Sequence, residues 1–468
     1  MRILEGLKRI SDENLISFHM PGHKNGRLLS SYFSGYLKYD ITEIPGADNL
    51  HNPVGMIKET EEMISEYYDS DKSYIIVNGS TAGIYSAVMA IANPSDKLII
   101  SRECHRSVYS ALILGGIEAE YIYPEIDSKS GAIKAINVEV VKEKFIKCPE
   151  AKGMVLTSPT YLGVVSPIKE ISEYLHSIGK VLIVDEAHGA HLKSSKLLPD
   201  DSISQGADVS IQSFHKTLPA LTQASVLHLN SKRVNRKKME SLLRIHQTSS
   251  PSYLIMASID AAMNLMADNG ETMSENLLNI INEFNENLEN HKYLKRMTIK
   301  NSILDPMRIV LIDKGNKRVG FHQLEMILRS DYRIQVEYAY DKGIVLIPSI
   351  ANTREDFLVL SRALDSISFD NLIIASRCDT MEYVRPVKRM SIRDAFYSES
   401  EDVNIRDSSK RTASEFIIPY PPGVPLLIPG EEIDNSMIHL VLQLNEKGVN
   451  VLGLSGEIKD NIAVIKED

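Results

Sequence analysis

Two chemically active side chains follow separate strand-like segments of the sequence. Asp185 ends the apolar run 181–185, and Lys216 comes shortly after the run 209–212. In open α/β sheets, ligands bind at the carboxyl ends of the strands, which is where both residues are expected to lie. A lysine amine can form a Schiff base with an aldehyde, and a buried carboxylate can keep a pyridine nitrogen protonated. The pair therefore indicates pyridoxal phosphate chemistry.

A turn rich in small and hydroxyl side chains, Asn-Gly-Ser-Thr-Ala-Gly at 78–83, lies between a β-rich run and an alanine-rich helical segment. Small residues let the backbone approach an anion, and a helix N-terminus attracts negative charge. The alternative is a plain helix start with a hydroxyl cap. Together with the aspartate and lysine downstream, the turn favours a cradle for the cofactor phosphate, for which the candidate residues are Ser80, Thr81, Ala82, Ser213 and His215.

Histidines at the same predicted edge of the sheet allow two interpretations. His105 follows a further apolar run, and its ring could stack on a flat cofactor or serve as a core or helix-capping histidine. Asp185, His188 and His191 are all residue types that ligate metals, so a metal site is an alternative. A metal leaves the lysine and the phosphate turn unexplained, and the motif His-Glu-x-x-His is absent. We therefore expect no metal.

The elements that must position these residues alternate between short apolar runs and helical patterns. This alternation is typical of a mostly parallel sheet covered by helices on both faces, and it predicts an α/β fold. The expected strands of the large domain are 74–77, 97–101, 120–123, 154–157, 181–185, 209–212 and 225–229. The main helical patterns lie at 57–69, 168–178 and 253–290. Later strands at 307–312 and 343–347, with a helix near 355–368, indicate a smaller α/β domain.

The composition and the apolar pattern along the chain suggest four consecutive parts. Glycine and proline interrupt the first of them, so we expect an irregular arm there. A polar and charged segment, 397–411, is expected to be an exposed loop or hinge. The expected parts are an arm at 1–50, a large cofactor-binding domain at 51–300, a small α/β domain at 301–380 and a C-terminal domain at 381–468.

Composition excludes several classes of function. The net charge is −10, with 62 acidic against 52 basic residues, which does not suit a nucleic-acid binder. Three scattered cysteines fit a reducing compartment. The N-terminus lacks the apolar core of a signal peptide, and no apolar run is long enough to span a membrane. We expect a cytoplasmic enzyme acting on a small molecule, without nucleic acid or membrane as partner.

Motifs along nearly the whole chain resemble the fold-type I pyridoxal-phosphate-dependent ornithine/lysine/arginine decarboxylases. The matching stretches are 19–24 (HMPGHK), 48–53 (DNLHNP), 78–81 (NGST), 104–107 (CHRS), 158–161 (SPTY), 185–191 (DEAHGAH), 213–218 (SFHKTL), 222–225 (TQAS) and 419–425 (PYPPGVP). The resemblance implies an aspartate-aminotransferase-like large domain. The chain is similar to short biosynthetic members that lack the N-terminal receiver-like domain. Phe214 and Glu103 depart from the family pattern, where Thr and Asn are common.

The resemblance also implies a role for each matching residue. Lys216 would be the Schiff-base lysine, Asp185 the pyridinium partner and His105 the stacking ring. Ala187 would press on the other face of the ring with His188 beside it, and Thr248 would reach the phosphate of the partner subunit. The implied active unit is a homodimer with a shared site, which could pair further. The remaining implied contacts, to the phosphate, are those of Ser80, Thr81, Ser213 and His215.

The implied reaction is decarboxylation of a basic amino acid in polyamine biosynthesis, with arginine favoured over lysine and ornithine. Lys216 and His215 are the candidate proton donors. A cationic substrate side chain calls for carboxylates, and the candidates are Glu43, Asp48, Glu415 and Glu431. The fold alone does not fix the reaction, so an aminotransferase is an alternative. A non-catalytic regulatory protein that binds amino acids is another.

Overall fold

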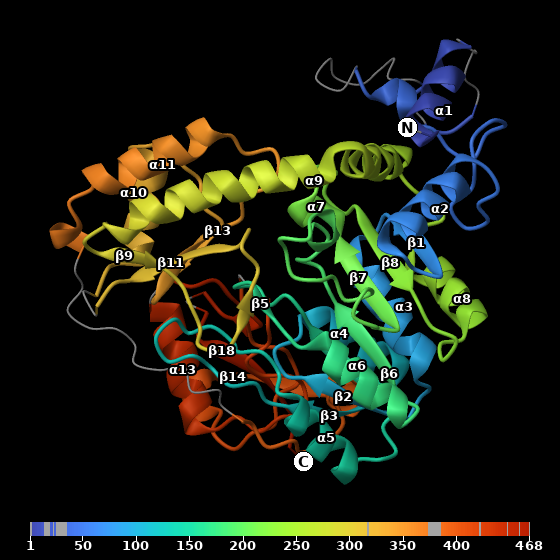
Figure 1. Cartoon of the computed structure of the whole chain (residues 1–468). Coiled ribbons are helices and arrows are strands. Elements are labelled where there is room, and N and C mark those ends of the chain that lie inside the picture. The colour runs from blue at the N-terminus through green and yellow to red at the C-terminus, as the bar shows by residue number, and fades with distance from the viewer. Residues whose placement is uncertain are drawn as a thin grey trace.

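The computed structural model describes residues 2–13, 19–21, 23–24, 35–315, 318–372, 385–420, 423–446, 448–457 and 459–467. A large sheet with its helices occupies one side of the molecule, and two smaller parts lie beside it (Figure 1). The long helix α9 (Tyr253–Glu289) runs from the large sheet to the first of the smaller parts. None of the helices in these ranges is long and apolar enough to cross a membrane.

The large sheet has seven strands in the order β1-β8-β7-β6-β4-β2-β3. Five neighbouring strands, from β7 to β3, are parallel, whereas β8 runs antiparallel to both β7 and β1. This confirms the predicted mostly parallel α/β sheet. The strand bounds are β1 Lys72–Ile76, β2 Lys97–Ser101, β3 Glu118–Ile122, β4 Gly153–Thr157, β6 Val181–Asp185, β7 Val209–Ser213 and β8 Ser225–Leu229.

Helices cover both faces of this sheet, which explains why its strands are apolar without alternation. In β6, Ile183 packs with one set of helices, while Leu182 and Val184 pack with the other. One face is covered by α3 (Gly79–Ile91), α4 (Arg106–Gly115) and α8 (Arg236–His246). The opposite face is covered by α5 (Val138–Lys147) and α6 (Ile168–Ser177).

The second part is an antiparallel sheet in the order β12-β13-β11-β9, packed against helices. The far half of α9 shares its apolar core with α10 and α11. A separate pair, β5 (Val164–Val165) with β10 (Ile303–Leu304), links this part to the large one. The bounds are β9 Leu294–Arg296, β11 Ile309–Asp313, α10 Phe321–Ser330, β12 Tyr338–Tyr340, β13 Gly343–Leu346 and α11 Arg354–Ser366.

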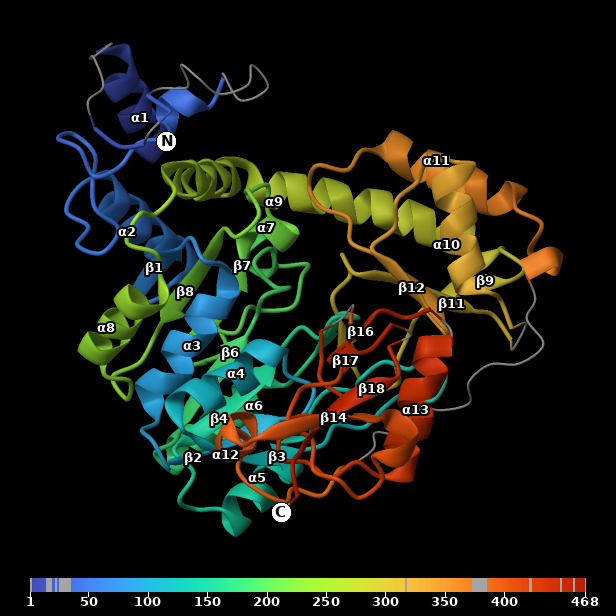
Figure 2. The same ribbon diagram turned by 180° about the vertical axis from the view of Figure 1, so that it is seen from behind.

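The C-terminal part packs against the large sheet near β2 and α4, as Figure 2 shows. Arg393 in α12 donates hydrogen bonds to the last carbonyls of α4, those of Ile113 and Leu114. The expected boundary at 380/381 lies outside the described residues. The elements are α12 Ile392–Tyr397, β14 Ser400–Asn404, β15 Ile418–Pro419, α13 Asn435–Glu446, β16 Val451–Leu452, β17 Leu454–Ser455 and β18 Asn461–Ile465.

Two predictions about irregular segments were wrong. The arm begins with a helix, α1 (Arg2–Asp12), because Ile3 and Leu7 bury an apolar stripe and Asp260 accepts a hydrogen bond of 2.9 Å from the Ile3 amide. The polar segment 397–411 contains the strand β14, which pairs with β18. Because β14 is an edge strand with exposed side chains, it needs no apolar face, and its polar sequence carried no strand signal.

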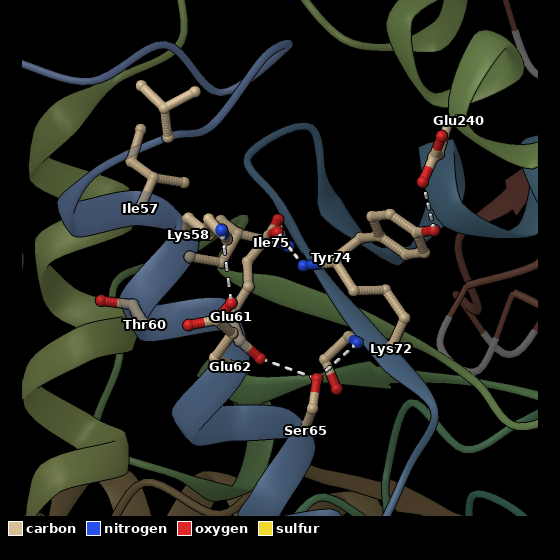
Figure 3. A network of polar contacts seen from close by, with 12 residues as sticks. Ile57, Lys58, Thr60, Glu61, Glu62, Ser65, Lys72, Tyr74, Ile75 and Glu240 are labelled. Atoms are coloured by element: carbon tan, nitrogen blue, oxygen red, sulfur yellow. Dashed lines mark hydrogen bonds and ion pairs between the residues drawn. The ribbon is translucent and has the colours of Figure 1, made fainter. Parts of the chain in front are cut away.

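A buried carboxylate connects α2 (Met56–Tyr68) to β1 (Figure 3). Glu61 forms an ion pair of 2.7 Å with Lys72 and accepts a hydrogen bond of 3.2 Å from the backbone amide of Ile75. Burial raises the pKa of Glu61, while the nearby lysine opposes the shift. An exposed pair on the same helix, Lys58 and Glu62, lies at 3.7 Å.

Candidate active site

A cavity of about 410 Å³ is lined by residues from all three parts of the molecule. Four of its lining residues were predicted from the sequence as site residues, and they meet because parallel strands end at one edge of the sheet. The other four come from the end of β4, the second part and the C-terminal part. The lining residues are His105, Tyr161, His188, His215, Lys216, Glu337, Ile347 and Tyr420.

Lys216 lies in α7 (Phe214–Thr217), the single helical turn that directly follows β7. Phe214 is fully buried and fixes this turn against the core below the sheet edge. The lysine Nζ faces the cavity and lies 3.1 Å from Nε2 of His188. Burial among the surrounding side chains lowers the pKa of Lys216, although the carboxylate of Asp185 opposes that shift. An amine with a lowered pKa is a better nucleophile at neutral pH.

Asp185 is the last residue of β6 and is buried, and it is not among the residues that line the cavity. Its Oδ1 accepts a hydrogen bond of 3.2 Å from the amide of Ala187, which is buried in the turn after the strand. Burial raises the pKa of Asp185, and the positive charge of Lys216 and the Ala187 amide act in the opposite direction. A buried carboxylate of this kind favours a cationic or proton-donating group next to it.

His105 caps the N-terminus of α4, with its Nδ1 accepting from the Ser107 amide at 3.3 Å and lying 2.9 Å from the Ser107 hydroxyl. Burial lowers the pKa of His105 to about 4, so the ring is neutral at neutral pH. Gly423 of the C-terminal part packs on the ring. Its φ is +85°, and a Cβ there would lie 3.1 Å from Cδ2 of His105. His105 thus caps the helix and also lines the cavity, and its stacking on a cofactor stays a prediction.

The phosphate turn opens α3, whose first residue, Gly79, has a φ of +71°. A Cβ at Gly79 would meet no atom within 4 Å, so the backbone there borders open space. Ser213, at the end of β7, donates a hydrogen bond of 3.0 Å to the hydroxyl of Ser80. Thr81 is partly exposed and Ala82 is buried. The turn is adjacent to the lysine helix but does not line the cavity, and its phosphate role stays a prediction.

His215 and Thr248 occupy different surroundings. His215 lines the cavity, and its Nδ1 lies 3.0 Å from the carbonyl oxygen of Ala224. Burial lowers the pKa of His215. Thr248 is exposed, and its amide donates to the side chain of Asn78 at 3.3 Å, next to the phosphate turn of its own chain. Its proposed reach to a partner subunit stays a prediction.

The four acids suggested for the substrate do not line the cavity. Asp48 accepts hydrogen bonds from the amides at the start of α2, including those of Gly55 and Ile57. Glu431 is buried in an ion pair with Arg102. Both carboxylates are thus engaged in holding the fold. Glu43 is exposed in the arm, and Glu415 accepts from the neighbouring amide of Phe416.

Sequence reasoning assigned no role to several residues that shape the cavity. The Tyr161 hydroxyl donates a hydrogen bond to the carboxylate of Glu337, which places an acid at the cavity wall. Arg308 is buried behind His188 and donates to its Nδ1 at 3.1 Å. Tyr161 follows the strand β4, so the rule of strand ends could have found it. Tyr420 lies in the motif 419–425, whereas Glu337 and Arg308 carry no comparable local signal.

The alternative of a metal centre gains no support from the geometry. Within the described ranges, no three His, Cys, Asp or Glu side chains gather as a metal site requires. His191 instead lies 3.1 Å from Asp305 in a buried pair.

The parallel sheet, with a cavity-facing lysine and a buried carboxylate at the ends of neighbouring strands, defines an enzyme of the fold-type I α/β class. The models of the "Orn/Lys/Arg decarboxylase, major domain" and "Orn/Lys/Arg decarboxylase, C-terminal domain" match residues 3–353 and 379–461. The chain belongs to this family of decarboxylases, as the motifs predicted.

A relative agrees with this assignment, and two solved structures share the fold. The arginine decarboxylase of Halalkalibacterium halodurans is 33% identical over 99% of this chain and 97% of its own length. Lysine decarboxylase A from Pseudomonas aeruginosa, at 18% identity, has the same fold with a TM-score of 0.85 over 99% of this chain and 80% of its own. An alanine–glyoxylate aminotransferase from Nostoc sp. shares the fold less completely, with 15% identity and a TM-score of 0.55 over 66% of this chain and 85% of its own.

Proposed function

We propose that this chain decarboxylates arginine with pyridoxal phosphate as its cofactor. One observation carries the proposal: a single cavity joins Lys216, beside the buried Asp185, to the carboxylate of Glu337. The first two residues suit an aldehyde cofactor with a pyridine ring, and the third suits the cation of a basic amino acid. The family assignment and the arginine decarboxylase at 33% identity support the same substrate class.

The residues present fit the proposed cofactor. The helix N-terminus at Gly79 borders open space and supplies amides and hydroxyls for a phosphate. When bound, pyridoxal phosphate supplies an aldehyde that takes the substrate amine and a protonated ring that accepts the electrons released with carbon dioxide. The buried Asp185 carboxylate would hold the ring proton, and the neutral ring of His105 would cover the flat face.

Two side chains at the cavity can move a proton. Lys216 presents Nζ with a lowered pKa, and His215 presents a ring whose pKa burial also lowers. After carbon dioxide leaves, a proton must return to the former α-carbon, and we assign Lys216 Nζ or the His215 ring as its donor. Apolar and aromatic lining residues, among them Ile347 and Tyr420, reduce the water around the departing carboxylate.

Substrate choice would depend on Glu337. A guanidinium is planar and can donate two parallel hydrogen bonds to one carboxylate. An ammonium interacts with a carboxylate as a single point charge instead. The Tyr161 hydroxyl already donates to this carboxylate and so restricts its orientation. We therefore place the arginine side chain against Glu337, with lysine and ornithine as weaker substrates.

The experiment is an incubation of the purified protein, supplied with pyridoxal phosphate, with arginine, lysine or ornithine in turn. Carbon dioxide release and the identity of the amine are measured. Arginine should give the fastest release, and Lys216→Ala should abolish it. Borohydride reduction followed by peptide mapping should recover the peptide around Lys216 with the cofactor attached. Transfer of the amino group to a keto acid without carbon dioxide would favour an aminotransferase, and recovery of that peptide unmodified would overturn the cofactor assignment.

We further propose that the enzyme works in the cytoplasm as a homodimer that feeds polyamine biosynthesis, with Thr248 of the partner subunit contributing to each site. The exposed position of Thr248 next to Asn78 supports a contact of this kind. Mixing the inactive Lys216→Ala chain with a Thr248→Glu chain tests it. A shared site predicts recovered activity in the mixed dimers, whereas sites confined to one chain predict none.

A further inference from the structure

We propose that Arg308 fixes the proton of His188 on Nε2 and thereby holds the Lys216 side chain as a neutral amine. Arg308 directly precedes β11 in the second part of the molecule, and its side chain is 4% exposed. It touches neither the cavity nor the lysine, so it would be a positioning residue that acts through His188. The importance of Arg308 for catalysis rests on the proposed function of Lys216. The protonation states proposed for His188 and Lys216 do not depend on that function.

The His188 ring bridges the two cationic side chains. Nη2 of Arg308 lies 3.1 Å from Nδ1, and Nζ of Lys216 lies 3.1 Å from Nε2. Tyr161 packs edge-on against the ring with a centroid separation of 5.0 Å, which restrains its rotation. The ring is buried, and each of its two nitrogens lies within hydrogen-bond distance of one of these side chains.

Counting protons then fixes the arrangement. A guanidinium stays protonated in proteins and can only donate, so Nδ1 of His188 must accept from Arg308. A neutral imidazole has one accepting nitrogen, which leaves the proton on Nε2. An Nε2–H group facing Lys216 requires an acceptor there, and only the uncharged amine has a lone pair to offer. A charged Lys216 would instead place two N–H groups against each other.

The electrostatic surroundings agree with this count. Burial holds the pKa of His188 well below its usual value, and the charge of Arg308 acts in the same direction, so the ring is not an imidazolium. The described residues offer no hydrogen-bond acceptor to Nε and Nη1 of Arg308. The Nδ1 atom of His188 is therefore the acceptor that this buried side chain has.

Other ionisable groups around the lysine do not reverse the balance. Burial lowers the pKa of Lys216, Asp185 opposes that shift, Arg308 reinforces it, and Glu337 opposes it. The remaining groups close to the lysine and the ring are the neutral His105, His191, which pairs with Asp305, and the Tyr161 phenol, whose pKa is raised by burial. A neutral amine is the form that attacks an aldehyde.

The test uses the full-length chain in its cofactor-free form and reads protonation directly. Nitrogen-15 NMR of labelled histidine, assigned with a His188→Phe variant, should show His188 protonated on Nε2 and not on Nδ1. Competitive acetylation with trace acetic anhydride, followed by peptide mass spectrometry, measures the fraction of neutral Lys216 amine across pH. Arg308→Met should slow acetylation of Lys216 at pH 7 by about tenfold or more, which corresponds to about one pKa unit.

Two further variants separate the relay from simple charge effects. His188→Phe keeps Arg308 but removes the bridge, so acetylation of Lys216 should slow here too; an unchanged rate would mean that charge alone acts and would overturn the proposal. Arg411→Met removes another partly buried guanidinium, which donates to the Ile465 carbonyl at 2.8 Å in the C-terminal part, and should leave the rate unchanged. If Arg308→Met fails to fold, the wild-type spectrum decides, because a proton on Nδ1 contradicts the relay.

Discussion

Arg102 and Glu431 form an ion pair of 2.9 Å between the loop after β2 and the C-terminal part, with side chains that are 1% and 2% exposed. Arg102 also donates to the carbonyl of Pro425 at 2.7 Å. The pair therefore anchors the segment 423–431, whose Gly423 packs on the ring of His105. One buried charge pair thus links the C-terminal part to the wall of the cavity.

Arg102→Met should loosen this anchor. Removing one partner of a buried pair typically costs about 3–5 kcal/mol, because the other charge stays buried alone. We expect faster amide hydrogen exchange in residues 423–431 and a weaker affinity for substrate. Arg389→Met is the matched control, because its pair with Glu432 lies in the same region but Arg389 is 55% exposed. Equal exchange in the two variants would contradict the anchoring role.

Glu337→Gln should reduce kcat/KM for arginine by about tenfold to a hundredfold, in keeping with the about 1.5–3 kcal/mol of a hydrogen bond to a charged group. The substitution preserves shape and removes the charge that we place against the guanidinium. Citrulline, a neutral isostere of arginine, provides the control, since its binding as a competitive inhibitor should change much less. Equal losses for both ligands would show that Glu337 acts on the shape of the cavity rather than on the cation.

Lys72→Met should destabilise the fold through Glu61, which keeps its buried carboxylate when its partner is lost (Figure 3). We expect a loss of about 3–5 kcal/mol in the free energy of unfolding, measured with urea. Adding Glu61→Leu to Lys72→Met should recover much of the loss by removing the unpaired charge. Lys58→Met breaks the exposed pair with Glu62 on the same helix and should cost no more than about 0.5 kcal/mol.

Glu186 gives the fold a stability that falls as pH rises. Burial and the neighbouring Asp201 raise the pKa of Glu186 to about 8 from an ordinary value of 4.5. Between pH 4.5 and about pH 8, Glu186 is ionised in the unfolded chain but still protonated in the folded protein. Its contribution to the stability of the fold is therefore fully present below pH 4.5 and is lost as the pH rises to about 8. Glu186→Gln should flatten this part of the profile by up to about 1.4 kcal/mol per pH unit. Urea unfolding at several pH values measures it, and the exposed Glu143→Gln should keep the wild-type slope.

The sequence predicted the parts of the fold that depend on local apolar patterns. The runs 97–101, 181–185 and 225–229 form strands with the expected bounds, because burial on both faces leaves a continuous apolar signal. The direction of β8 was not predictable, since an apolar run carries no information about which way the strand points. The helix α1 and the strand β14 were missed because each is short and polar on its exposed side.

The residues of the candidate site also divide into those that the sequence predicted and those that it did not. Lys216, His105 and His188 meet in the cavity as expected, because each lies just beyond a strand of the parallel part of the sheet. Glu337 and Arg308 belong to the second part of the molecule, and their places depend on how the parts pack together. The expected acid Asp48 lies in the motif 48–53 and Glu431 lies shortly after the motif 419–425, but such a position does not tell whether a carboxylate contacts a ligand or the backbone. Here both contact the backbone.

The position of β1 has a consequence for synthesis on the ribosome. Its partner in the sheet is β8, with Lys72 opposite Leu229. During translation, β1 therefore has no partner strand until β8, the last strand of the large sheet in the sequence, has been synthesised. Such a long-range pairing forms slowly and leaves an apolar strand open to neighbouring nascent chains. We expect production of this protein in bacteria to depend on chaperones that shield this strand, more than its folded stability would suggest.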